Sequence, residues 1–188
     1  SDTRKNISPI IEEFLVEKLI ALGIPDVKIQ VSVKKSDIFT ENGNNVVQLM
    51  FSANKNRTLQ PIAEVASGGE ISRVMLAVKS LLVHKSELPT IIFDEIDTGI
   101  SGETANRVGE IMKFMSENTQ VITITHLPQI AAKGIHHFKV YKDTSSEMVN
   151  TYIKKLSPSE REHEIAQMVS GKQVTEASLQ NARELLKK

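Results

Sequence analysis

The sequence predicts an α/β fold in which parallel strands are flanked by helices and accompanied by β-hairpins. The main observation is a strand, a helix and a second strand between Thr90 and Thr125, an order that gives parallel strands joined by a right-handed crossover. A second observation is the alternation of apolar and polar residues over 27–33 and 46–53, typical of half-buried strands. A third is the helical spacing of apolar residues over 7–22.

The composition is that of a globular protein and excludes several kinds of site. Of the 188 residues, 40% are hydrophobic and 24% are charged, so the chain can bury one core with small appendages. Lys+Arg and Asp+Glu both number 23, which leaves no net basic footprint for nucleic acid. The absence of cysteine excludes disulfides, thiol catalysis and thiolate metal sites, and is compatible with a reducing compartment. No apolar run approaches the length of a membrane span.

The first elements form a helix followed by a hairpin. The helix over 7–22 is expected to stop at Gly23, because Pro25 follows closely. The polar segment 41–45 is a turn between the two alternating runs, so these runs are expected to pair. A polar loop is predicted over 54–61.

A second helix is predicted to begin at Ser67 and to continue to Leu82. Ser67 and Glu70 have the spacing of a capping box, in which each side chain binds a backbone amide of the other residue. Gly68 and Gly69 allow backbone amides to approach an anion closely, and the positive end of the helix dipole points to the same place. This arrangement suits a γ-phosphate, with the Ser67 hydroxyl as a further donor. The alternative is a glycine turn before an ordinary capped helix.

The apolar strand expected over 90–93 ends in two acids, Asp94 and Glu95. Such a strand places carboxylates at the carboxyl edge of a sheet, where ligands of α/β proteins bind. Asp94 could hold Mg²⁺ directly or through water. Glu95 could orient or deprotonate an attacking water molecule. The alternative is that both acids cap the following loop or are solvated.

Two polar residues near the next strand are further candidates. His126 follows the strand expected over 121–125, where it could contact a γ-phosphate, although a lone histidine is more often packed or simply exposed. Asp97 belongs to the turn 97–101 and could cross a dimer interface to reach a partner's site. The alternative is a loop in which Ser101 caps the next helix.

The last part of the chain predicts another hairpin and two helices. The runs 138–142 and 148–153 flank a polar turn. The segment 157–160 is a strong helix start, with proline at the first position and glutamate at the third. That helix is expected to end at Gly171, and the last helix to open at Thr175.

A phosphate-binding loop of the form Gly-x-x-x-x-Gly-Lys-Ser/Thr does not occur in the 188 residues. The Gly-Lys pair Gly171-Lys172 is followed by Gln173, and Ala166 stands where the first glycine is needed. The sequence therefore predicts half of an ATP site.

Taken together, the runs 65–79, 93–102 and 125–132 resemble the RecN family of bacterial DNA repair proteins, which are SMC-like ABC ATPases. The similarity extends from about residue 5 to nearly the end and corresponds to the C-terminal lobe of the ATPase head. The resemblance implies a P-loop NTPase-like lobe that is incomplete without an N-terminal lobe.

The resemblance also implies how the chain is organised. The whole of 1–188 would be one head lobe. Within it, about 1–25 would be the helix at which a coiled-coil arm returns, 26–135 the region of the nucleotide motifs, and 136–188 a C-terminal hairpin and helices.

The resemblance assigns roles to the candidate residues. The signature that contacts ATP held by a second head would comprise Ser67, Gly68, Gly69 and Glu70. The remaining roles would be Mg²⁺ binding by Asp94, catalytic base for Glu95, D-loop for Asp97 and catalytic switch histidine for His126.

The same resemblance implies cofactors and partners. ATP and Mg²⁺ would bind the complete head, and ATP sandwiched between two heads would drive a homodimer that hydrolysis releases. The other partners would be the N-terminal lobe of the same protein, and DNA through the full-length protein, in double-strand break repair and recombination. No membrane is implied, and the location would be the bacterial cytoplasm, associated with the nucleoid. The chain by itself, which lacks the phosphate loop, is expected to be inactive.

Three alternatives remain open at this point. One is the nucleotide-binding subunit of a transporter, although Glu70 stands where transporters usually have glutamine and Ile96-Asp97 where they usually have Pro-Thr. Another is the head lobe of a different SMC or ABC-type ATPase. The third is a non-hydrolysing dimerisation module, which would have no need of a base such as Glu95.

Overall fold

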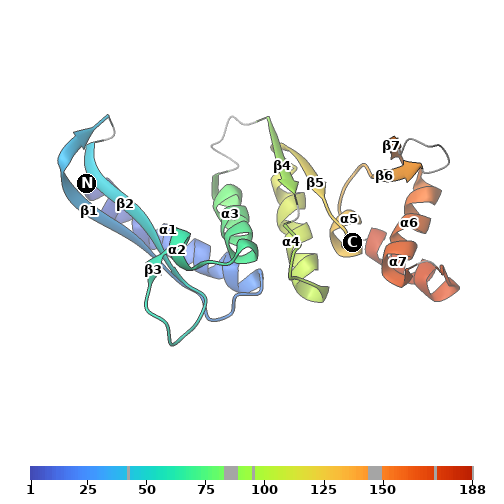
Figure 1. Ribbon diagram of the computed structural model, residues 1–188, viewed down its shortest axis with the longest axis horizontal. Coiled ribbons are helices and arrows are strands. Elements are labelled where there is room, and N and C mark those ends of the chain that lie inside the picture. Colours follow the sequence, from blue (N-terminus) through green and yellow to red (C-terminus); the bar gives the residue numbers. More distant parts are fainter. Residues whose placement is uncertain (42, 83–88, 95, 144–149, 172, 188) are drawn as a thin grey trace.

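The structure is a computed structural model that describes residues 1–41, 43–82, 89–94, 96–143, 150–171 and 173–187. Its elements follow one another along the long axis of the molecule, from the N-terminal helix and hairpin to the C-terminal helices (Figure 1).

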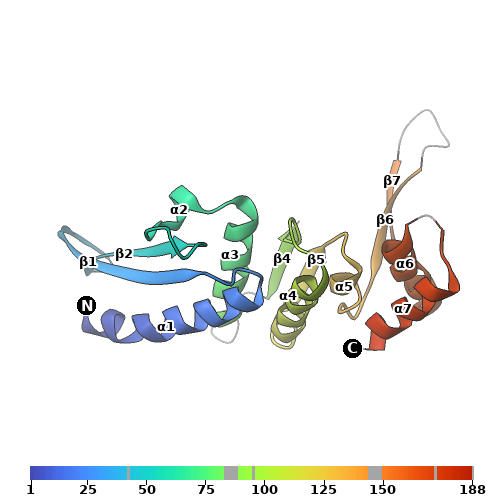
Figure 2. The ribbon, with the colours of Figure 1, turned by 90° about the horizontal axis from the view of Figure 1, so that it is seen from below.

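The N-terminal part is a long helix packed along an antiparallel hairpin (Figure 2). Its elements are α1 (Asp2–Ala21), β1 (Lys28–Thr40), β2 (Gly43–Ser52) and the short β3 (Gln60–Pro61). Leu15 and Leu19 of α1 are buried together with Phe51 of β2. On the outer edge of β1, the Glu12 carboxylate accepts a hydrogen bond from Val31 N at 2.7 Å. The predicted helix and hairpin are present. The helix begins earlier than predicted, at Asp2, and the strands run further than predicted, since β1 reaches Thr40 and β2 begins inside the predicted turn 41–45, at Gly43.

The central part contains a two-stranded parallel sheet. Its elements are α2 (Ile62–Val65), α3 (Gly68–Leu82), β4 (Thr90–Asp94), α4 (Gly102–Met115) and β5 (Gln120–Ile124). β4 and β5 pair in parallel from Thr90 opposite Gln120 to Asp94 opposite Ile124, which confirms the predicted strand–helix–strand unit.

The two faces of the β4–β5 sheet differ sharply. Phe93 points into the main core, where it is clustered with side chains of α3 and α4 that include Leu76 and Val108. The opposite face carries Ile92, Ile122 and Ile124, which are 64%, 44% and 56% exposed. We call these three isoleucines the bare face of the sheet. Because alternate residues of a strand point to opposite faces, one side of each strand is packed and the other is uncovered.

The C-terminal part has a small core of its own. Its elements are α5 (Pro128–Ala131), β6 (Phe138–Asp143), β7 (Asn150–Lys155), α6 (Pro158–Ser170) and α7 (Glu176–Lys187). Ala132 packs with Ile165, Ala166 and Ala182, so the end of α5 belongs to the same cluster as α6 and α7. The predicted hairpin and both helices are present. The capping box of α6 forms through Ser157 and Glu160.

The accessible surface of the molecule is large for its size. It measures 12347 Å², whereas the usual scaling with mass gives about 9,000 Å² for a compact monomer of this length. The excess agrees with a fold in which apolar faces are left uncovered. Among the described residues, no helix is both long and apolar enough to cross a membrane.

Candidate functional site

The parallel strands bring two of the predicted site residues, Asp94 and His126, to one edge of the sheet. Asp94 is the last residue of β4 and pairs with Ile124, the last residue of β5. Thr125 and His126 follow β5 directly. The carboxyl ends of neighbouring parallel strands lie side by side, so the acid and the histidine face the same edge of the sheet, where α/β proteins bind ligands.

Asp97 joins the two strand ends from inside. Its side chain is only 1% exposed. The Oδ2 atom accepts hydrogen bonds from Thr125 Oγ1 and from His126 N, the second at 3.0 Å, and lies 3.2 Å from His126 Nδ1. Thr125 Oγ1 in turn accepts a hydrogen bond from Leu127 N at 3.0 Å. Oδ1 of the same carboxylate is buried without a hydrogen-bond partner in the part of the chain that the structure describes. The carboxylate thus contacts its own chain, and its role toward a second copy stays a prediction.

The ring of His126 lies close to Asp97 on one side and is largely exposed. Its side chain is 75% exposed although Nδ1 lies beside the buried Asp97 carboxylate. The Nδ1 atom is within ion-pair distance of Asp97 Oδ2, at 3.2 Å, which leaves the opposite ring nitrogen, Nε2, for a ligand. The arrangement can therefore present Nε2 to an anion at the edge of the sheet.

The start of α3 has the predicted capping box. Glu70 Oε2 accepts from Ser67 N at 2.7 Å and from Ser67 Oγ at 2.8 Å, and Glu70 N donates to Ser67 Oγ at 3.4 Å. The Ser67 hydroxyl proton is thus committed to Glu70. A phosphate would receive it only if this internal bond were exchanged.

The two glycines at the start of α3 have different surroundings. A Cβ atom on Gly68 would meet nothing within 4 Å, whereas one on Gly69 would lie 3.2 Å from the Thr98 carbonyl oxygen and 3.5 Å from Arg73 Nη1. The first turn of α3 therefore lies against the turn that contains Asp97. Burial lowers the pKa of Arg73, and the nearby Glu70 opposes this effect. The helix start, the turn after β4 and the end of β5 form one continuous group of contacts.

The acidic pair is only partly described. Asp94 is exposed at the end of β4. Glu95 lies outside the described residues, and its role stays a prediction. Within the described ranges, no group of three or more His, Cys, Asp or Glu residues could hold a metal ion. One exposed carboxylate suits Mg²⁺, which is usually held by one or two carboxylates together with substrate phosphates and water.

Two features of this site were not predicted from the sequence. Thr125 contributes a hydroxyl to Asp97, but a threonine after a strand is too common to indicate such a role. The short helix α5 follows His126 closely and is only four residues long, so it has no periodic pattern to detect.

Comparison with known proteins gives a consistent result at the level of sequence. No family model matches the chain. Over 176 residues it is 43% identical to a protein from Rickettsia felis named DNA repair protein RecN, a match that covers 94% of this chain and 32% of the relative. Proteins of the same name match in Vibrio cholerae, with 39% identity over 91% of this chain, and in Halalkalibacterium halodurans, with 37% identity over 99% of it. The chain spans about a third of the length of these relatives.

Solved structures of similar fold are heads of SMC ATPases. One, from work on ATP-driven dimerisation and DNA-stimulated activation of SMC ATPases, has a TM-score of 0.56 and 19% identity, and the match covers 91% of this chain and 97% of that one. The Smc head with a coiled coil and joint from Pyrococcus yayanosii gives a TM-score of 0.65 at 19% identity over 85% of this chain and 29% of that one. The chain therefore has the fold of part of an SMC head domain.

Proposed function

We propose that this chain is the C-terminal half of the ATPase head of a RecN-type protein that acts in DNA double-strand break repair and recombination. The observation that carries the proposal is that Asp94 and His126 stand at the carboxyl ends of two paired parallel strands, where the buried Asp97 contacts His126. The homology to proteins named DNA repair protein RecN supports the same conclusion.

In this proposal each residue has a task toward ATP. Gly68 leaves open space before the first turn of α3, where backbone amides can accept a phosphate of ATP held by a second head. Asp94 would hold Mg²⁺, which neutralises phosphate charge when it is bound. Glu95 would orient and deprotonate the attacking water, and His126 would contact the γ-phosphate through the ring nitrogen that Asp97 leaves free.

The missing partner would be an N-terminal lobe of the same protein. The bare face of Ile92, Ile122 and Ile124 supports this part of the proposal, because side chains of this kind are normally buried in a parallel sheet. A lobe packed there would also supply the phosphate-binding loop that the 188 residues lack. We further propose a homodimer of heads around ATP, contact with DNA through the full-length protein, and a cytoplasmic location.

The proposal also assigns each region of the chain a place in the head lobe. α1 would be the segment where a coiled-coil arm enters the head, and 26–135 would carry the nucleotide motifs. The region 136–188 would close the lobe with its hairpin and helices.

Two alternative functions compete with this proposal, and the turnover experiment described next tests the second of them. A head lobe of another SMC or ABC-type ATPase has the same fold, but the named relatives at about 40% identity favour RecN. A non-hydrolysing dimerisation module would keep the fold without turnover.

The proposal is tested by ATP turnover after mixing this chain with a separately produced N-terminal lobe that carries the phosphate loop. We expect turnover in the mixture, none with either piece alone, and loss of turnover with Glu95→Gln. A mixture that forms a complex but remains inactive, even with the arm and DNA present, would favour the dimerisation module.

A further inference from the structure

The side chain of Arg161, a residue of α6, binds backbone carbonyl groups at and after the end of α5. It lies in the first turn of α6, where the positive end of the helix dipole disfavours a cation. Its Nη2 atom donates to Ala132 O at 2.8 Å and to Gly134 O at 2.5 Å, and Nη1 donates to Ile135 O at 3.3 Å. Carbonyl groups at and beyond a helix C-terminus have no partner within the helix, so the guanidinium closes the end of α5.

α5 is in turn joined directly to the candidate switch residue. His126 is followed by Leu127, the N-cap of α5, and the helix starts at Pro128. Leu127 N donates to Thr125 Oγ1 at 3.0 Å, and Leu127 O accepts Ala131 N at 3.0 Å. A displacement of α5 would therefore pull on the end of β5, because no flexible linker separates the two.

The other side of α5 is fixed by α4. A Cβ atom on Gly109 would lie 2.9 Å from Lys133 Cγ and 3.4 Å from Gln129 O, so the glycine lets the two helices approach closely. The Lys133 side chain is only 5% exposed and pairs with Glu110. α5 is thus held between α4, which belongs to the main core, and α6, which belongs to the C-terminal cluster.

We propose that Arg161 is a positioning residue for His126. The Arg161 side chain holds the end of α5 against α6 and so fixes the strand end where His126 meets ATP. The inference rests on the proposed function, and it adds a link between the C-terminal helices and the site. Arginine suits this task because its planar fork presents five N–H donors, whereas a lysine ammonium cannot meet the three carbonyl groups in the same geometry.

Arg183 provides a matched control on the same pair of helices. Its Nε donates to Glu162 at 2.9 Å and its Nη1 to Glu176 at 3.5 Å, so it joins α7 to α6. No contact with α5 is found for it among the described residues. Arg183→Gln removes an arginine from the helical pair while leaving the proposed link intact.

The experiment uses the full-length protein with Arg161→Gln, Arg161→Lys and Arg183→Gln. In Arg161→Gln we expect hydrogen exchange at the amides of His126, Ala131 and Ala132 to rise about tenfold or more, because their anchor is lost. We expect kcat for ATP to fall about fivefold or more with KM changed less than about twofold, since positioning acts on the transition state. Arg161→Lys should lie between wild type and Arg161→Gln, and Arg183→Gln should match wild type in both measurements.

Two results would overturn the inference. One is unchanged exchange at 126–132 in Arg161→Gln; the other is a parallel change of kcat and KM together with lost protection throughout the C-terminal helices. Absence of ATP turnover in the wild-type protein would instead overturn the proposed function. The two failures are distinguishable because the exchange measurement does not depend on turnover.

Discussion

At the scale of single residues, the buried carboxylate of Asp97 decides how the two strand ends meet. One of its oxygens accepts from Thr125 Oγ1 and His126 N, and lies beside His126 Nδ1. A carboxylate this deeply buried is costly unless charge-assisted hydrogen bonds compensate for its lost hydration. The same contacts that stabilise the turn therefore also orient the histidine.

Asp97→Asn tests this dual role. The amide keeps the shape but removes the charge, so hydrogen bonds worth about 1.5–3 kcal/mol are weakened. We expect the free energy of unfolding to fall by about that amount in urea denaturation, and ATP turnover of the full-length protein to fall with it. Thr125→Val, which removes one donor, should cost less, about 1 kcal/mol. Equal stability of wild type and Asp97→Asn would refute this role.

The two adjacent glycines offer a second test at this scale. Alanine is favoured over glycine in a helix by about 1 kcal/mol. Gly68→Ala should retain that gain because its Cβ meets open space, whereas Gly69→Ala should lose it because its Cβ approaches the Thr98 carbonyl to 3.2 Å. Thermal unfolding should show Gly69→Ala to be the less stable of the two variants. Gly68→Ala should still weaken ATP-driven pairing of heads, since its methyl group enters the space left for phosphate.

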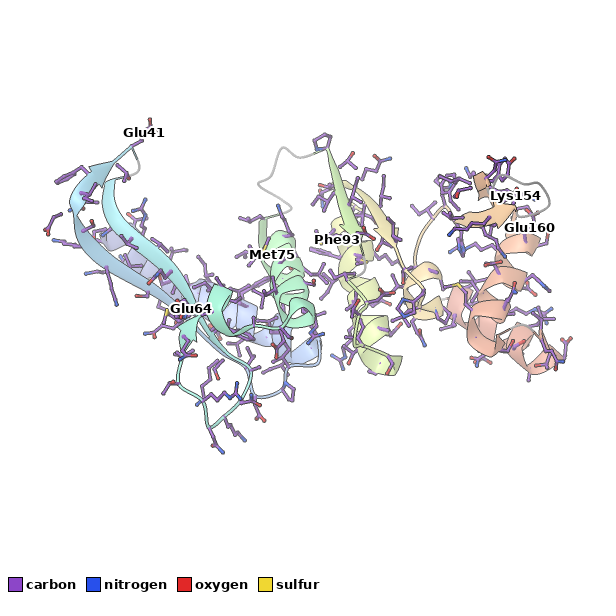
Figure 3. All side chains as sticks on the ribbon, in the orientation of Figure 1. Glu41, Glu64, Met75, Phe93, Lys154 and Glu160 are labelled. Carbon is purple, nitrogen blue, oxygen red and sulfur yellow. The ribbon has the colours of Figure 1, made fainter. Side chains whose placement is uncertain are left out.

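At the scale of elements, α6 shows how a helix start is fixed by local sequence. Ser157 N donates to Glu160 Oε2 at 2.9 Å and Glu160 N to Ser157 Oγ at 3.4 Å, as the Ser-x-x-Glu spacing predicts. Lys154 on β7 reaches the same glutamate, and Figure 3 shows the two side chains next to each other. The β6–β7 hairpin and α6 are thereby joined next to Arg161, at the start of α6.

This arrangement predicts a dependence of stability on pH. The hydrogen bond from Lys154, followed by those from Ser157, lowers the pKa of Glu160 from 4.5 to about 2. Because the pKa is lower in the folded state, the stabilisation is complete above pH 4.5 and is lost as the pH falls toward about 2. Glu160→Gln should reduce the fall in unfolding free energy across this window, as measured by urea denaturation. Lys154→Met should reduce it as well, and identical pH profiles would contradict the prediction.

At the scale of the whole molecule, the uncovered surface determines what the chain must bind. The bare face lies on the side of the β4–β5 sheet opposite the main core. Parallel sheets are normally covered on both faces, and two strands form an unusually small sheet. A second lobe would both extend the sheet and bury the exposed isoleucines.

The triple variant Ile92→Thr, Ile122→Thr, Ile124→Thr tests this surface. Replacing three isoleucines that the N-terminal lobe would bury should weaken its binding by about 3 kcal/mol, or roughly 100-fold in Kd. Isothermal titration calorimetry with the separately produced lobe would measure the change. Ile135→Thr is the control, because Ile135 is 81% exposed but lies outside the sheet. An unchanged Kd for the triple variant would exclude this face as the contact.

The sequence by itself determined the features whose partners lie close along the chain. The capping boxes at Ser67 and Ser157 and the alternating strands follow from spacings of a few residues. The parallel unit from Thr90 follows from the order strand, helix, strand along one continuous segment. The short elements α2, α5 and β3 were missed, because four residues or fewer cannot show a period.

Only the tertiary structure decided how the site is held together. Asp97 and His126 are 29 residues apart in the chain, and Arg161 lies 29 residues beyond the Ala132 carbonyl that it binds. The approach of Gly69 to Thr98 is likewise a contact between distant segments. A carboxylate or a guanidinium can form hydrogen bonds with any suitably placed polar group. Its presence in the sequence therefore does not predict which residue it will bind. The packing of the helices around the two strands makes that choice.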